Sequence, residues 1–197
     1  MNMKTFAFAF LAWLPLGFAI TCLIGFTYVS YQQTGRQMAN DPQIRMAEDG
    51  ALMLAKDNTP AAIVPRGTLI DIGKSIAPWI AVYDSKGLPL ESSAFLDNAP
   101  PQPPIALFDE STWIGPKTYH TPAGNETRVT WQPRENVRQA IVLVHAANGE
   151  FVVSGRSLRD TEGRVAVFGV NSLIAWFVTV VGSLFFALVY AFFKTRA

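Results

Sequence analysis

The sequence has few of the residues from which metal, redox and many catalytic sites are built. Its 197 residues include one cysteine and two histidines. A single cysteine, Cys22, excludes a disulfide bond within the chain, and two isolated histidines do not form a zinc ligand set. The patterns G-x-S-x-G and H-E-x-x-H and the P-loop are absent as well. We therefore expect no enzyme activity, no metal, no cofactor and no nucleic-acid partner.

Charged residues are missing from two long stretches, one near each end of the chain. None occurs between Lys4 and Arg36 or between Arg164 and Lys194. Each stretch is longer than the roughly 20 apolar residues that cross a bilayer core, so we predict two transmembrane helices in contact with lipid. A cleaved signal peptide is the alternative for the first stretch. Its apolar run is longer than that of a signal peptide, however, and no clear A-x-A site follows it.

Basic residues at the ends of the two stretches predict their orientation. Lys4 precedes the first, and Lys194 and Arg196 follow the second, so the positive-inside rule places both termini in the cytoplasm. The stretch between them has 13 basic and 15 acidic residues, a net charge of −2, and is expected outside. The predicted parts are a transmembrane helix with its extension (1–36), an extracytoplasmic domain (37–164), a second transmembrane helix (165–193) and a short tail (194–197).

The central stretch alternates between helical and strand periodicity. Apolar residues at helical spacing predict a helix from Gln43 to Lys56, and a second short helix is expected from Leu69 to Ala77. Period-two patterns and turn residues predict five strands, at Trp79–Tyr83, Leu88–Ser92, Thr127–Gln132, Arg138–Ala146 and Phe151–Arg156. Pro89 indicates an edge strand, and Asn148-Gly149 indicates a hairpin. The fold class is therefore expected to be α+β with an antiparallel sheet.

Four stretches look like sensor regions of bacterial receptors and histidine kinases. They are Ala39-Asn40-Asp41-Pro42-Gln43-Ile44, Ile80-Ala81-Val82-Tyr83-Asp84-Ser85-Lys86-Gly87, Thr130-Trp131-Gln132-Pro133 and Gly155-Arg156-Ser157-Leu158-Arg159-Asp160-Thr161-Glu162. Together with the order of helices and strands, they make residues 37–164 resemble a single Cache (PAS-like) extracytoplasmic sensor domain. The resemblance implies a PAS/Cache-like antiparallel sheet with N-terminal helices, held at a bacterial cytoplasmic membrane by two spans.

The same resemblance implies a ligand site between the sheet and the membrane-distal loops and helices. Five polar or aromatic residues on these elements are the expected ligand-binding residues: Arg138, Trp131, Arg128, Tyr119 and His145. Arg138 is either the anchor of a small anionic or amino-acid-like ligand or the partner of a surface acid such as Glu135. Trp131 is alternatively a core residue, and His145 a strand residue near a hairpin end.

Small residues recur every four positions in both predicted spans. Gly17, Thr21 and Gly25 do so in the first, and Ala175, Thr179, Ser183, Ala187 and Ala191 in the second. Such stripes let helix backbones approach closely in lipid. Either the two helices of one chain pack together, or a stripe receives a helix of a homodimer partner or of another membrane protein.

The C-terminal part of the chain links the predicted sheet to the second span. Ser157-Leu158-Arg159-Asp160 resembles a capping box, from which a helix is expected to continue through Phe193. Only four residues follow. We therefore expect a ligand-sensing membrane protein without its own output domain, which acts through a partner in the membrane. The alternative is an accessory subunit of a membrane complex that uses the central domain as a protein-binding surface.

Overall fold

The computed structural model describes residues 3–38, 41–113 and 118–194 and has an α+β fold. The chain divides into two compact units. One unit contains Met1–Gly35 and Gly163–Ala197, and the other is the central domain, Arg36–Glu162. Two long apolar terminal helices thus flank an α+β domain with an antiparallel sheet, as the sequence predicted.

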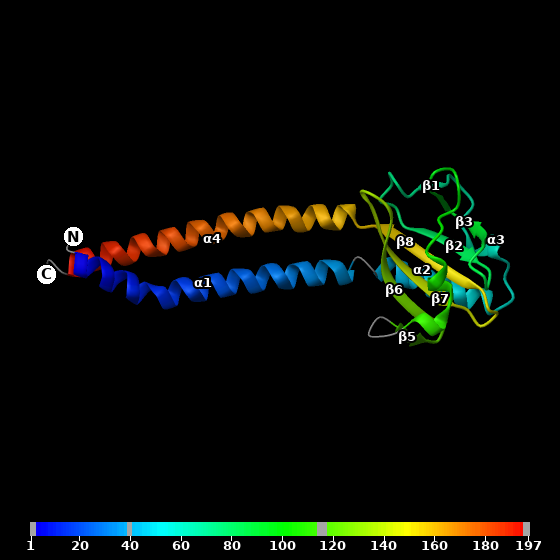
Figure 1. Ribbon diagram of the computed structural model, residues 1–197, viewed down its shortest axis with the longest axis horizontal. Coiled ribbons are helices and arrows are strands. Elements are labelled where there is room, and N and C mark those ends of the chain that lie inside the picture. The colour runs from blue at the N-terminus through cyan, green and yellow to red at the C-terminus, as the bar shows by residue number, and fades with distance from the viewer. Residues whose placement is uncertain (1–2, 39–40, 114–117, 195–197) are drawn as a thin grey trace. The chain divides into compact units, whose positions relative to one another are not determined.

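The first unit is a pair of antiparallel helices, α1 (Met3–Met38) and α4 (Arg159–Lys194) (Figure 1). Both are long and apolar enough to cross a membrane, which is consistent with a two-pass membrane protein. Side-chain contacts join them: Trp13 Nε1 donates to Ser183 Oγ and Trp176 Nε1 donates to Thr21 Oγ1, both at 2.9 Å, and the rings of Tyr28 and Tyr31 stack on Phe168. Ser183 therefore faces α1 of its own chain.

The second unit is built on a sheet of six strands in the order β3-β2-β8-β7-β6-β5. All neighbouring strands in it are antiparallel. The strands are β2 (Trp79–Tyr83), β3 (Pro89–Ser92), β5 (Thr118–Thr121), β6 (Gly124–Arg134), β7 (Val137–His145) and β8 (Phe151–Ser157). β3, which begins at Pro89, is an edge strand as predicted, and β7 and β8 are the central pair.

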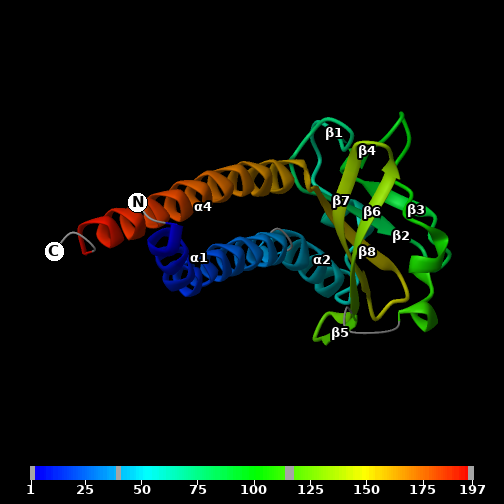
Figure 2. The ribbon, with the colours of Figure 1, turned by 60° about the vertical axis from the view of Figure 1, so that its left-hand side comes forward.

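The two faces of this sheet are covered by different parts of the chain. Helix α2 (Asp41–Leu54) packs on one side, here called the helix face (Figure 2), and α3 (Pro60–Ile63) contributes Ile63 to the same core. The other side, the loop face, packs against residues from the segment between Ile70 and Trp113. That segment contains β1 (Ile70–Asp71), β4 (Ala94–Phe95) and two 3-10 turns, η1 (Ile105–Phe108) and η2 (Glu110–Thr112). Alternate residues of each strand therefore belong to separate cores.

The helix predicted from Leu69 to Ala77 is wrong. Ile70 and Asp71 instead pair in parallel with Ala94 and Phe95. The Asp71 side chain then accepts the amide of Gly73 at 3.0 Å, and the Asp71 carbonyl accepts the amides of Lys74 and Ser75. An aspartate that bonds the backbone two residues ahead favours a turn over a helix, which the apolar spacing did not reveal.

Of two hairpins in the sheet, the sequence predicted the one between β7 and β8 but not the one between β5 and β6. Gly149 has φ of +86° in the tight connection between β7 and β8, which confirms the hairpin predicted there. Strand β5 was not predicted. It forms a hairpin with β6 that closes at Gly124, where φ is +135° and a Cβ atom would lie 2.0 Å from the His145 carbonyl oxygen.

The predicted cap of the last helix is shifted by one position. Ser157 is the final residue of β8, and its hydroxyl accepts the amide of Arg159, the first helical residue, at 3.3 Å. The Leu158 carbonyl accepts the amide of Glu162. Leu158 is therefore the N-cap residue, the last residue before the helix, whose carbonyl accepts the first hydrogen bond of the helix. The serine therefore bonds the first turn as expected, although the helix starts at Arg159 rather than Leu158.

Candidate functional site

The predicted ligand-binding residues do not form one site. Tyr119 and Arg128 lie together on the helix face. Trp131 and His145 lie on the loop face but at opposite ends of the pairing between β6 and β7. Trp131 pairs across the sheet with Gln139 and is 8% exposed, so it is part of the core. His145 pairs with Asn125 near the far end of β7. The structure thus offers two separate polar clusters, one on each face.

Arg138 lies apart from both clusters. It is at the start of β7, half exposed, and its guanidinium forms an ion pair with the Glu162 carboxylate in the first turn of α4. Of the two alternatives for this residue, the partner in this ion pair is Glu162 rather than Glu135. As a ligand anchor, Arg138 stays a prediction.

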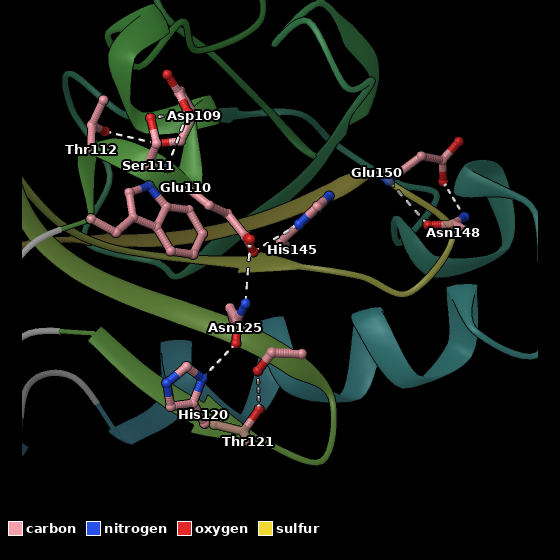
Figure 3. A network of polar contacts seen from close by, with 12 residues as sticks. Asp109, Glu110, Ser111, Thr112, His120, Thr121, Asn125, His145, Asn148 and Glu150 are labelled. Carbon is pink, nitrogen blue, oxygen red and sulfur yellow. Dashed lines mark hydrogen bonds and ion pairs between the residues drawn. The ribbon is translucent and has the colours of Figure 1, made fainter.

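The loop-face cluster is a network of side chains from four elements (Figure 3). The Glu110 carboxylate of η2 bonds His145 Nδ1 at 2.7 Å and accepts from the Asn125 amide at 3.3 Å. Asn125 Oδ1 in turn bonds His120 Nδ1 at 2.6 Å. Strand register explains the arrangement, because His120, Asn125 and His145 are directly opposite one another on β5, β6 and β7.

Aromatic packing holds the buried side of this network. The His145 ring stacks on Phe151, its neighbour on β8, with ring centroids 4.4 Å apart. The edge of Trp113 meets Phe151, and the Trp113 indole donates to the Leu107 carbonyl. Both Glu110 carboxylate oxygens and one nitrogen of each histidine have partners. This satisfied network fixes η2 against the sheet, which is a structural role for His145.

The helix-face cluster has a buried acid that is incompletely paired. Glu126 of β6 is fully buried, and Arg128, two residues along the same strand, bonds its Oε1. The Arg128 guanidinium also lies over the Tyr119 ring, 3.9 Å from the centroid. Within the described part of the chain, the other carboxylate oxygen, Oε2, has no hydrogen-bond partner. Buried polar atoms without a partner are uncommon and costly, so this oxygen needs explaining.

The surroundings of Glu126 raise the pKa of its carboxyl group. Burial raises its pKa above the usual range, and the Arg128 guanidinium lowers it by a hydrogen bond and by its charge. Glu48 of α2 raises it again, by its charge and by a hydrogen bond between the two carboxyl groups. The net direction is upward.

Sequence reasoning missed Glu126, Glu48 and a second buried polar residue, Gln43. Gln43 is fully buried on α2, and neither its amide oxygen nor its nitrogen has a partner in the described residues. One signal was available: Glu126 and Arg128 are two positions apart on a strand, which places opposite charges on the same face. No group of three or more possible metal ligands occurs in residues 3–38, 41–113 and 118–194.

Replacing Glu126 by glutamine is expected to remove a pH dependence of stability. Because the folded state raises the pKa of this carboxyl group, it binds the proton more tightly than the unfolded chain does. Stability is therefore fully present below the unfolded pKa near 4.5 and falls as the pH rises through the folded value. Glu126→Gln should remove this pH dependence of the free energy of unfolding, because an amide does not titrate in this range.

Urea unfolding of wild type and variant between pH 4.5 and pH 8 measures this effect. Glu91→Gln, a change at an exposed position of β3, is the control and should leave the pH profile unchanged. Parallel profiles for wild type and Glu126→Gln would show that Glu126 does not titrate in this range.

Comparison of the chain with protein-family models, with curated proteins and with solved structures found no match. The coarse architecture of two apolar terminal helices and an α+β domain is established by the structure itself. The Cache-like assignment of the domain stays a prediction from the sequence pattern.

Proposed function

We propose that the protein is a membrane-anchored sensor whose central domain binds a small polar ligand outside the membrane and passes its state through α4 to a partner within the membrane. The observation that carries this proposal is the junction between the sheet and α4. α4 is a single helix of 36 residues that begins two residues after β8, one of the two central strands.

Three contacts join Leu158 and the first turn of α4 to the rest of the domain. The Leu158 amide donates to the Arg138 carbonyl of β7 at 2.9 Å, and the Arg159 guanidinium donates to the Lys74 carbonyl at 2.6 Å. The ion pair of Arg138 and Glu162 adds a third. A change in β7, β8 or the turn after β1 therefore acts directly on the residues from which α4 starts. An uninterrupted helix can transmit such a change along its axis, at about 1.5 Å per residue.

The helix-face cluster of Tyr119, Glu126, Arg128 and Glu48 supports a ligand-binding role. A buried carboxyl oxygen without a partner, next to a guanidinium and an aromatic ring at the surface, suits a ligand with both a donor and an acceptor group. Small amines, amino acids and hydroxylated carboxylates fit this description. Because β6 pairs with β7, this cluster is one strand away from the strand that holds Leu158.

A thermal-shift screen of the full chain in lipid nanodiscs against these classes tests the proposal. A ligand should raise the unfolding temperature of the wild type, and the double variant Glu126→Gln, Arg128→Gln should lose the response. Arg138→Ala, which removes the predicted anchor at a separate place, distinguishes the two locations. A complete screen without any response would contradict the sensor function.

Inserting two glycines after Arg159 is expected to separate ligand binding from its effect on α4. Glycine is the poorest helix former apart from proline, so the insertion interrupts the first turn and shifts its contacts out of register. The ligand-induced thermal shift should persist. A ligand-induced change in the crosslinking rate of cysteines in α4 should disappear.

The matched control is the same insertion in the exposed turn between Lys86 and Gly87, which should preserve both responses. If the insertion after Arg159 also preserved both, the signal would not travel through the junction described above.

An accessory role has support from the free edge of the sheet. β3 has one neighbouring strand, and Leu90 within it and Leu88 just before it are 45% and 61% exposed. Exposed edge strands with apolar side chains can pair with a strand of another protein. Replacing Leu90 by lysine should abolish capture of such a partner without a change in the thermal response to ligand.

A further inference from the structure

In the part of the chain that the structure describes, the buried side-chain atoms without a hydrogen-bond partner belong to the contact between α2 and the sheet. They are the amide oxygen and nitrogen of Gln43 on α2 and Oε2 of Glu126 on β6. On the loop face, by contrast, Glu110 and His145 bond each other. Unpaired buried polar atoms are uncommon and costly. The polar groups between α2 and the sheet are therefore less well paired than those on the loop face.

The C-terminal half of α2 is held on the sheet by apolar contacts. At Gly50, a Cβ atom would lie 3.0 Å from the Val152 side chain, so the backbone of α2 lies close to β8. Ala51 and Leu54 are buried in the same core. None of these residues is ionisable. The polar contacts of α2 come earlier in the helix, and they are the ones that can respond to pH.

Glu48 of α2 makes such a contact with Glu126. Glu48 is half-buried, and the two carboxyl groups lie within hydrogen-bonding reach of each other. An ionised carboxylate only accepts, so a hydrogen bond between two carboxyl groups requires a proton on one of them. The Arg128 guanidinium donates to Oε1 of Glu126, which leaves Oε2 without a donor as long as both acids are ionised. A proton on the pair supplies a donor.

The surroundings of the pair suit a proton better than a larger cation. The groups beside Glu126 that are ionisable or charged come from α2, β5 and β6, and they are Glu48, Tyr119 and Arg128, with Arg45 and Asp49 exposed next to Glu48. On β7 the residue opposite Glu126 is the apolar Val144. The Glu126 side chain has no exposed surface. In residues 3–38, 41–113 and 118–194, no third possible ligand joins the two acids to make a metal site.

We propose that a proton shared by Glu48 and Glu126 fastens α2 to the sheet, and that α2 is released when this proton is lost. The inference adds a regulator to the helix-face cluster on which the proposed function rests. With the proton bound, one carboxyl group donates to the other across the contact between α2 and β6. Without it, two negative charges face each other, and the guanidinium of Arg128 offsets only one of them.

The direction of the pH effect follows from the raised pKa of Glu126. The folded domain keeps the proton more tightly than the unfolded chain does, so the hold on α2 is complete below the unfolded pKa near 4.5. It is lost as the pH rises through the folded value. Because α2 begins at Asp41 and α1 ends at Met38, a rise in pH acts on the part of the domain that follows the first apolar helix in the chain.

Urea unfolding of the full chain in lipid nanodiscs between pH 4.5 and pH 8 tests which residues share the proton. Glu48→Gln should move the fall in stability to lower pH, because its amide donates to Glu126 without a proton from solution. The double variant Glu48→Gln, Glu126→Gln should have the same flat profile as Glu126→Gln alone. Asp49→Asn, at the exposed neighbouring position, is the matched control and should keep the wild-type profile. A wild-type profile in Glu48→Gln would overturn the shared proton.

Hydrogen–deuterium exchange, with each rate divided by the intrinsic rate at that pH, tests whether α2 is the element released. One proton changes an opening equilibrium by at most about tenfold per pH unit. Protection of the α2 amides should fall by up to about that factor above the transition, while protection of β7 and β8 stays constant. In Glu126→Gln, protection of α2 should not depend on pH. Equal losses in α2 and β8, or constant protection of α2 in the wild type, would contradict the proposal.

The outcomes of these measurements are distinguishable from those of the ligand screen. If protection of α2 were independent of pH in a chain that still responds to a ligand, the proton would be contradicted and the sensor function would stand. If protection of α2 depended on pH in a chain that responds to none of the ligand classes, the sensor function alone would be contradicted.

Discussion

A cysteine at position 86 is expected to react almost completely with a membrane-impermeant maleimide in intact bacterial cells, and a cysteine at position 194 only after lysis. The reason is the distribution of basic residues: Lys4, Lys194 and Arg196 flank the two apolar helices and favour the cytoplasm. Lys86 lies in the exposed turn between β2 and β3, and Lys194 is the last residue of α4. Both variants are made in a Cys22→Ala background, so that each has one thiol.

Detergent-treated cells serve as the control, since both cysteines should then react. The opposite pattern, with position 194 labelled and position 86 protected, would place the central domain in the cytoplasm and contradict an extracytoplasmic sensor. Labelling of both positions in intact cells would show that the two helices do not hold the ends of the chain inside.

Replacing Trp79 by alanine should lower the free energy of unfolding of the central domain by about 3–5 kcal/mol. Trp79 is the largest completely buried side chain of the domain. Its indole donates to Gln139 Oε1 at 3.2 Å, and the Gln139 amide donates to the Ile72 carbonyl. Truncation therefore leaves a large cavity and also a buried acceptor without its donor. Pulse proteolysis of the full chain in urea measures the loss, and Trp176→Ala in the first unit is the control.

The same position allows a sharper test of the packing between β2 and β8. Gly155 is paired with Trp79, and a Cβ atom there would lie 2.5 Å from the indole ring. Gly155→Ala should therefore cost about 1–3 kcal/mol in the wild type, but little in a Trp79→Leu background, where the ring is absent. Equal costs in both backgrounds would show that the glycine is needed for another reason.

The sequence predicted the elements whose residues are buried on both sides or followed by distinctive turns. Trp79–Tyr83 and the strand near Val142 are continuous apolar runs, and Asn148-Gly149 marks the hairpin after the second of them. By contrast, β5 is four polar or aromatic residues with two exposed side chains, so it has no hydrophobic signal. It is a strand because it pairs with the edge of β6 that faces away from β7, which is a tertiary cause.

The candidate site was less accessible to sequence reasoning than the fold. Arg128 and Tyr119 were singled out as polar and aromatic residues on strands, and the structure places them in contact. The acid that Arg128 bonds, Glu126, was overlooked, because burial of a charged residue depends on α2 covering that part of the sheet. Arg138 looked like a ligand anchor since its carboxylate partner, Glu162, belongs to a helix that starts more than twenty residues later.

The strand order also constrains how the domain is made. β2 lies between β3 and β8. Trp79 pairs with Gly155, which is 76 positions further along the chain, so β2 is paired on both edges only after β8 has been synthesised. Such distant pairing forms slowly compared with local hairpins. During synthesis, β2 and β3 must remain an isolated hairpin until β8 arrives, and α4 follows immediately. Completion of the sheet and synthesis of α4 are therefore nearly simultaneous events. A nascent chain arrested before Phe151 should be a substrate for proteases.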